Sequence, residues 1–159
     1  MSWKDFKKMG RLTEEAFAKK HLTDPIWATD YEDKYEHWDV KGALNGAQIL
    51  KFDVKGLKKK NRWDKHTQDE CAWVEGTNVH GHPGWIKGQA DYIVFERDDC
   101  WLLVNREELR EHVSMKLQEY NYIEGKKPYH VYQRAGRNDK ITLVPYKDIE
   151  KLRVRKLEK

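Results

Sequence analysis

The chain has 159 residues, and 36% of them are charged. Seven Trp, eight Tyr and four Phe argue against an intrinsically disordered chain, and the length predicts one domain with a hydrophobic core. The net charge of +4 is modest, but basic residues concentrate in LKKKNR and KLRVRKLEK, which is typical either of a solvated charged surface or of a site for a polyanionic partner such as nucleic acid. Two cysteines without disulfide or metal spacing, no signal peptide and no segment of transmembrane length predict a cytoplasmic protein.

The N-terminal half of the chain predicts a helix and then a β-hairpin. Thr13, followed by two glutamates and a short apolar run, is typical of a helix start, and Asp24-Pro25 predicts the end of that helix or the beginning of the next turn. The segments HWDVKGAL and QILKFDVKG alternate in polarity around Asn45-Gly46, the strongest short hairpin signal. A basic, polar loop is expected over residues 57–70.

The rest of the chain predicts further strands and one long helix. CAWVEGTNV indicates a third strand, and DYIVFE and CWLLVN indicate two more, joined by the charged turn RDD. REELREHVSMKLQEY has apolar residues four positions apart and predicts a helix over residues 106–120. PYHVYQR and KITLVPY predict a second hairpin, and the final DIEKLRVRKLEK predicts a short helix or a tail.

This order of elements predicts an α+β (mixed α/β) chain with one central mixed sheet flanked by helices. A single domain is expected over residues 1–159, with a core over about 13–120 and a C-terminal hairpin and basic tail over about 126–159. The echo between WDVKG and FDVKG is explained by the two strands of one hairpin and is too short for a repeat architecture.

The register of the first hairpin determines which acidic side chains meet. With Asn45-Gly46 as a two-residue loop, Asp39 stands opposite Phe52, so Asp39 and Asp53 point to opposite faces. Lys55 lies two residues beyond Asp53 and shares its face. A change of one residue in the loop length reverses this assignment.

Glu75, on the strand expected next, adds a second carboxylate if that strand neighbours Asp53. Two buried carboxylates repel each other unless a cation joins them or one of them takes up a proton. Carboxylate oxygens suit Mg²⁺ or Mn²⁺, with water and substrate phosphate completing the coordination shell. With Lys55 orienting an attacking hydroxide, this set of groups predicts phosphodiester hydrolysis.

Over roughly residues 13–96, the chain resembles the PD-(D/E)xK nuclease superfamily, which includes restriction endonucleases, Holliday-junction resolvases and many phage nucleases. The stretch WVEGTNVHGHPGWIKGQADYIVFE is also similar to small phage or bacterial members. The resemblance implies a restriction endonuclease-like core, in which a helix precedes a three-stranded meander, a second helix and a further strand. It also implies an acid on the first helix, an aspartate on the second strand and (D/E)xK on the third.

Two mappings of this motif onto the chain stay open, and the first uses Asp53 as the strand aspartate and Glu75 as the acid of (D/E)xK. In this mapping Asp53 and Glu75 are the metal ligands, and the helix acid is Glu15, with Glu14 as the alternative. Thr77 stands where the motif has lysine, which puts activity in doubt. This mapping is preferred because it fits the expected strand count and the Asn-Gly register.

Lys55 is the candidate to replace the missing lysine, because lysine migration between neighbouring strands occurs in this superfamily. The second mapping takes Asp39 as the strand aspartate and Asp53-Val54-Lys55 as the complete D-x-K, and it needs no migration.

The resemblance therefore implies a Mg²⁺- or Mn²⁺-dependent nuclease, with DNA expected above RNA and a homodimer left open. Cationic residues of the loop would bind phosphates, and one aromatic residue would stack on a base. These loop residues are Lys58, Lys59, Lys60, Arg62 and Trp63. The alternatives are a non-catalytic nucleic-acid-binding module on the same fold and an interaction protein whose aromatic surface binds a protein partner.

Overall fold

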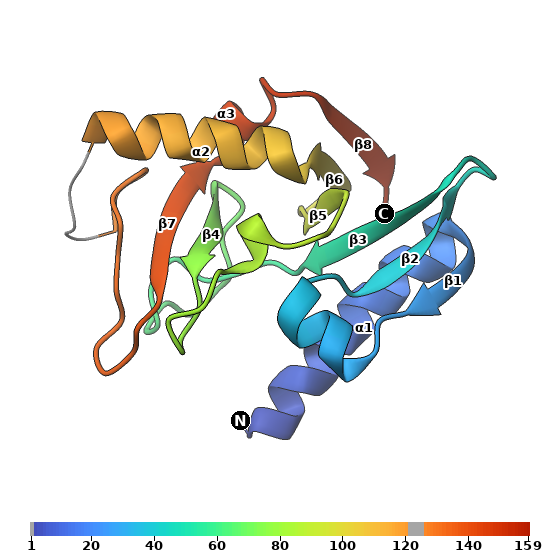
Figure 1. The fold of residues 1–159 in the computed structure, drawn as a ribbon, viewed down its shortest axis with the longest axis horizontal. Coiled ribbons are helices and arrows are strands. Elements are labelled where there is room, and N and C mark those ends of the chain that lie inside the picture. The colour runs from blue at the N-terminus through green and yellow to red at the C-terminus, as the bar shows by residue number, and fades with distance from the viewer. Residues whose placement is uncertain (1, 121–125) are drawn as a thin grey trace.

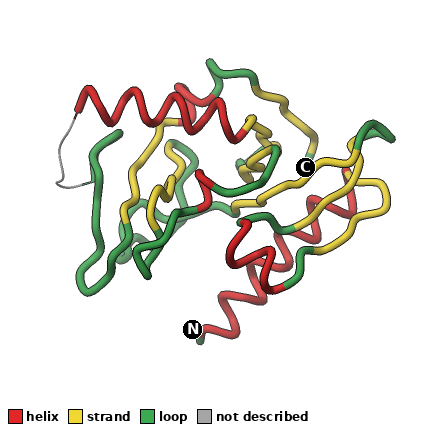
Figure 2. The backbone as a smooth tube through the Cα atoms, viewed as in Figure 1, coloured by secondary structure: helices red, strands yellow, loops and turns green. Residues whose placement is uncertain are grey.

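The structure, a computed structural model, describes residues 2–120 and 126–159. Its main feature is a mixed sheet of six strands in the order β1-β2-β3-β5-β6-β8, accompanied by a two-stranded sheet of β4 and β7 (Figures 1 and 2). The strands are β1 (Leu22–Trp27), β2 (Val40–Leu44), β3 (Ile49–Lys55), β4 (Cys71–Thr77), β5 (Tyr92–Glu96), β6 (Cys100–Asn105), β7 (Lys140–Pro145) and β8 (Val154–Glu158). The helices are α1 (Trp3–His21), α2 (Arg106–Tyr120) and α3 (Tyr146–Ile149), with short turns of helix at η1 (Glu32–Glu36) and η2 (Trp85–Lys87). The prediction of an α+β chain around a central mixed sheet is confirmed.

The first helix starts ten residues before the predicted start at Thr13. Ser2 and Asp5 form a capping box, in which the Ser2 N–H donates to Asp5 Oδ2 over 2.8 Å. Asp24-Pro25, predicted as a turn, lies inside β1 instead. Asp24 has a φ of 48°, and the pairing of β1 with β2 shifts there, so the turn residues form an irregularity in an edge strand.

The hairpin of β2 and β3 forms around Asn45-Gly46, as predicted, with positive φ at both residues and the Ala47 N–H donating to the Leu44 carbonyl. The predicted register is wrong by one residue, however. Val40 pairs with Phe52, and Ala43 with Ile49, so one more residue separates the strands than a two-residue loop allows. Asp39 therefore does not stand opposite Phe52, and this shift changes which side chains meet at the end of the hairpin.

The prediction that the strand after the basic loop adjoins β3 is also wrong. β3 pairs in parallel with β5, whereas β4 pairs antiparallel with β7 in the separate small sheet. β5 is a short apolar run that is buried along its middle, as a central parallel strand requires, whereas β4 alternates between buried and half-buried residues. The sequence of β5 therefore suits the interior position better than that of β4.

The C-terminal region differs from its prediction in two places. Of the expected second hairpin, KITLVPY forms β7, while PYHVYQR forms no named strand and contributes bridges such as Tyr132 to Ile141. The tail, predicted as a helix or as irregular, contains α3 and then β8, which pairs with β6 at the edge of the large sheet. The inward side chains of β8, Val154 and Leu157, each pack on one of the two hydrophobic clusters, and this packing holds the strand.

The large sheet carries a hydrophobic cluster on each face. On one face, Phe17 and Ala18 of α1 pack on Phe52, Val54 and neighbouring residues of the sheet. On the other face, side chains of β5 and β6 pack against the small sheet, η2 and α2. Asp53 and Lys55 alternate with Phe52 and Val54 along β3, so they face the small sheet. Within the described ranges, none of the helices combines the length and the apolar character that spanning a bilayer requires.

Candidate active site

Asp53 and Lys55 form an ion pair at the carboxyl end of β3. Lys55 Nζ lies 2.9 Å from Asp53 Oδ1, and Asp53 is only 3% exposed. The second carboxylate oxygen, Oδ2, is buried and has no hydrogen-bond partner among the described residues. A buried carboxylate oxygen without a partner is costly, so this atom is available for a ligand.

Asp39 immediately precedes β2, and its main chain and its side chain both bond to β3. Its N–H donates to the Phe52 carbonyl over 2.8 Å, and its Oδ2 accepts from the Val54 N–H over 2.7 Å. The carboxylate thus takes a place that a main-chain acceptor would have in a regular ladder. Burial, and then the nearby charge of Asp53, raise the pKa of Asp39 well above its usual range. Asp39 and Asp53 therefore share one site, contrary to the prediction of opposite faces.

A third carboxylate, from α1, approaches this pair. Burial, followed by the charge of Asp33, raises the pKa of Glu14 to about 7, and Asp53 adds to this rise, while Arg11 opposes it. Arg11 pairs with both helix acids, but the side chain of Glu15 is 40% exposed against 20% for Glu14. The helix acid that reaches the site is therefore Glu14 rather than the preferred Glu15.

Lys55 is held in its charged form among these acids. Burial lowers the pKa of its ammonium, but the charges of Asp53 and Asp39 and the hydrogen bond to Asp53 outweigh that effect and raise it. Its Nζ also lies 4.8 Å from the centroid of the Trp85 ring, a cation–π distance. The ammonium is thus positioned by two elements, β3 and η2, and stays a hydrogen-bond donor at neutral pH.

The acids of this site fit a divalent cation held by few protein ligands. The ammonium of Lys55 pairs with one carboxylate, Asp53, whereas burial and then the charge of neighbouring carboxylates raise the pKa values of Asp39 and Glu14, so one ammonium does not offset all three acids. Within residues 2–120 and 126–159, no group of three or more His, Cys, Asp or Glu side chains is close enough to hold a metal together. Mg²⁺ needs no such group, because one or two carboxylates suffice when water and substrate oxygens fill the shell. Asp39 and Asp53 supply such a pair.

Glu75 does not neighbour Asp53 in either sheet, because among the described strands β4 pairs with β7 and β3 with β2 and β5. Burial raises the pKa of Glu75, and the charges of Lys55, His37 and Arg134 oppose that rise. Its carboxylate thus approaches Lys55 from the small sheet. The expected metal pair of Asp53 and Glu75 on adjacent strands is therefore wrong in its strand arrangement.

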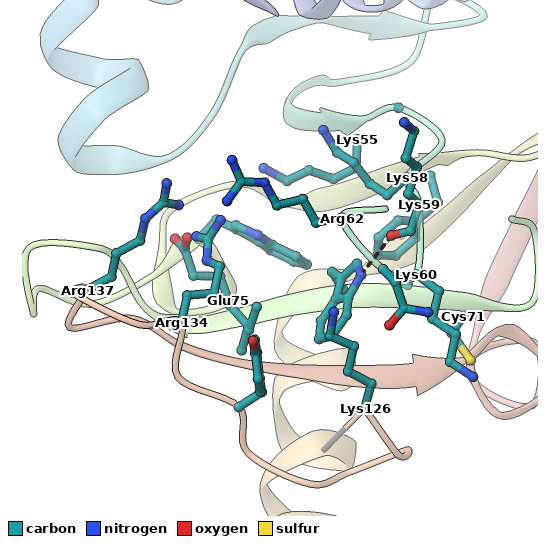
Figure 3. Close-up of a pocket in the computed structure, with 18 of the residues that line it drawn as sticks. Lys55, Lys58, Lys59, Lys60, Arg62, Cys71, Glu75, Lys126, Arg134 and Arg137 are labelled. Carbon is teal, nitrogen blue, oxygen red and sulfur yellow. Dashed lines mark hydrogen bonds between the residues drawn. The ribbon is translucent and has the colours of Figure 1, made fainter. Parts of the chain in front are cut away.

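A basic pocket with a volume of about 900 Å³ opens beside Lys55. Figure 3 shows cations from the loop after β3 and from the segment before β7 around the same space. Glu75 is the one acid among the described residues that line it. The cations that line the basic pocket are Lys55, Lys58, Lys59, Lys60, Arg62, Lys126, Arg134 and Arg137.

The amide side chain of Gln68 joins the two ends of the loop over residues 57–70. Gln68 Nε2 donates to the carbonyls of Lys58 and Cys71, and Gln68 Oε1 accepts from the N–H groups of Glu70 and Cys71. The Trp73 indole N–H donates to the Lys59 carbonyl over 3.1 Å and ties the loop to β4. The loop cations are therefore held over the pocket by specific hydrogen bonds.

Of the predicted loop residues, Lys58, Lys59, Lys60 and Arg62 line the basic pocket. Trp63 does not; it is 87% exposed, and Arg62 lies 5.2 Å from its ring centroid.

Sequence reasoning missed five further lining residues: Trp73, Lys126, Tyr132, Arg134 and Arg137. For Tyr132, Arg134 and Arg137, the alternation of aromatic and basic residues in PYHVYQRAGR was the available signal. Only the fold could reveal that this segment faces the loop after β3.

The stability of the cation-free protein should decrease as the pH rises from about 4.5 to about 7. The pKa of Glu14 is about 7 in the folded chain against an ordinary 4.5, so the folded state binds the Glu14 proton more tightly than the unfolded state does. The stability gained from this tighter binding is lost as the pH rises through this range. Glu14→Gln should flatten the decrease. Thermal midpoints measured in EDTA from pH 4 to pH 8 test this, and equal slopes for both proteins would contradict it.

The site thus consists of Asp39, Asp53 and Lys55, with Glu14 beside them and the basic pocket adjoining at Lys55. No protein-family model, curated protein or solved structure matches this chain. Functional inference therefore depends on the chemistry of these residues.

Proposed function

We propose that the protein is a divalent-cation-dependent nuclease that hydrolyses phosphodiester bonds through Asp39, Asp53 and Lys55. The observation that carries the proposal is the Asp53–Lys55 ion pair next to Asp39, with one buried oxygen of Asp53 left without a partner among the described residues. Excess negative charge beside a fixed ammonium suits a site that binds a cation and a phosphate together.

The order of elements supports a restriction endonuclease-like core and the second mapping of the PD-(D/E)xK motif. α1 is followed by the meander β1-β2-β3, with Asp39 directly before the second strand and Asp53-Val54-Lys55 ending the third. Glu14 supplies the acid of the first helix. In this mapping Lys55 is the lysine of the motif, so Thr77 no longer gives a reason to expect an inactive site.

In this proposal Asp39 and Asp53 would hold Mg²⁺ or Mn²⁺. When bound, the cation would lower the pKa of water and offset the negative charge that develops on the phosphoryl group. Lys55, fixed by Asp53 and Trp85, donates hydrogen bonds to the attacking water or to a phosphate oxygen. The water oxygen bonds to phosphorus and the water gives up a proton, the P–O ester bond breaks, and the leaving oxygen takes up a proton, so that one water is added across the ester bond.

The basic pocket supplies the binding surface for the phosphate backbone. Its cations would release counterions on binding, so affinity should decrease steeply with salt concentration. DNA is proposed above RNA only through the family resemblance.

The proposal is tested by incubating the protein with plasmid, with linear duplex and with single-stranded DNA, each in Mg²⁺, Mn²⁺ or EDTA. Cleavage is expected with either cation and not in EDTA. Glu111→Gln removes an exposed carboxylate on α2 and is the control for variants that remove a carboxylate of the site. Salt-sensitive binding without cleavage in any cation would overturn the nuclease and favour the non-catalytic module.

A further inference from the structure

The basic pocket combines a cationic rim with an aromatic wall. We propose that it takes unpaired nucleotides, with phosphates on the rim and a base stacked on Trp73 and Tyr132. Single-stranded nucleic acid, or a strand locally opened from a duplex, would then be the substrate that reaches the acids at β3. The inference deepens the proposed nuclease function and rests on it for the position of the reacting phosphate.

The rim carries positive charge that the described residues leave uncompensated. Lys58, Lys59 and Lys60 form no ion pair with any carboxylate in residues 2–120 and 126–159. Burial, followed by the charge of Lys55, lowers the pKa of Lys58. Of the cations across the pocket, Arg134 pairs with Asp139 over 2.5 Å, and no ion pair of Arg137 occurs within those ranges. Such a rim is suited to several phosphates of one backbone.

The wall offers flat apolar surface to a base. Trp73 is half-buried, and its indole N–H is fixed on the Lys59 carbonyl, so the ring is oriented before any ligand binds. The Tyr132 ring lies next to it, with centroids 6.4 Å apart and planes inclined by 44°. Lys126 Nζ, 5.5 Å from the Tyr132 centroid, brings a cation to the same wall. Stacking on such rings needs an exposed base face.

A base-paired duplex does not present these faces. Its bases are stacked on one another, and it offers phosphates and groove edges to a protein. A duplex bound at this pocket would leave the aromatic wall without a base stacked on it. A single strand can place phosphates on the cations of the rim and a base on the aromatic wall.

The pocket also leads to the proposed catalytic residues. Lys55 lines the pocket and bonds to Asp53, so one side chain belongs to both places. A strand with its base on Trp73 would extend along the loop cations toward Lys55.

Binding is measured in EDTA, where no cleavage is expected, by the anisotropy of a labelled oligonucleotide offered as a single strand and as a duplex of the same sequence. The single strand should bind at least about tenfold more tightly. Trp73→Leu and Tyr132→Leu should each weaken single-strand binding roughly 5- to 100-fold and leave duplex binding unchanged. Tyr31→Leu, an exposed tyrosine outside the pocket, is the matched control and should leave both unchanged. Trp73→Phe, which keeps a stacking ring, should restore most of the affinity.

Equal affinity for the two forms, or equal weakening of both in Trp73→Leu with Trp73→Phe no better, would overturn the inference. Cleavage is followed separately with Mg²⁺. Cation-dependent cleavage of duplex without any preference for single strands would retain the nuclease and reject this inference. Single-strand binding that depends on Trp73, without cleavage in Mg²⁺ or Mn²⁺, would contradict the proposed nuclease activity and support the binding of unpaired nucleotides in the basic pocket.

Discussion

Asp39→Asn is expected to lower the rate of cation-dependent cleavage at least about 100-fold, while the protein stays folded. The amide oxygen can still accept the Val54 N–H, so the hairpin keeps its bond, but one of the two proposed cation ligands loses its charge. In EDTA at neutral pH the variant should melt at a higher temperature than the parent, because the amide removes both the cost of burying a charged carboxylate and its repulsion of Asp53. Initial cleavage rates and thermal midpoints, with and without Mg²⁺, measure both effects.

The same variant separates the two mappings of the motif. If Asp53 and Glu75 held the cation, Asp39→Asn would cleave normally and Glu75→Gln would not. That pattern of results would contradict the site proposed at the end of the β2–β3 hairpin. Glu111→Gln controls for the loss of an exposed negative charge.

Lys55→Met should lower cleavage by at least about 100-fold and also destabilise the protein, by about 3 kcal/mol in the absence of a divalent cation. The chemical loss follows from the missing hydrogen-bond donor. The stability loss follows because Asp53, 3% exposed, is left as a buried carboxylate without its ammonium partner 2.9 Å away. Added Mg²⁺ should recover part of this stability, since it supplies positive charge to the same carboxylate.

A double variant distinguishes an unpaired charge from lost packing. Lys55→Met with Asp53→Asn should regain most of the stability that Lys55→Met loses, without regaining cleavage. Urea unfolding of the parent, the two single variants and the double variant gives the coupling free energy. Additive losses would show that the two side chains do not interact, and that outcome would remove the ion pair from the argument for the site.

Local sequence signals predicted the elements that local interactions define. The Asn45-Gly46 turn, the apolar runs of β5 and β6 and the helix over residues 106–120 lie where their patterns place them. β1 and β8 were missed because both are edge strands, and their pairing with β2 and β6 defines them more than their own composition does. The position of β4 depended on a contact with β7, more than 60 residues later, that no local pattern records.

The candidate site was only partly predictable for a related reason. Asp53, Lys55, Glu14 and Asp39 could each be singled out from the chain, but the choice between mappings depended on the hairpin register. One additional residue between Ala43 and Ile49 reverses the predicted faces, and short loop sequences do not specify such an insertion reliably. The cations and aromatic residues across the pocket required the three-dimensional placement of a segment far along the chain.

The hydrogen bonds of Gln68 at the neck of the basic loop have a consequence for how the protein could change over time. Because the side chain and the main-chain N–H of Gln68 join the two ends of the loop, residues between them can be exchanged, added or removed with little strain on the large sheet. The loop could thus come to bind another polyanion while the proposed catalytic acids, Asp39 and Asp53, stay in place. Recognition could then adapt in the loop while the chemistry at the sheet is preserved.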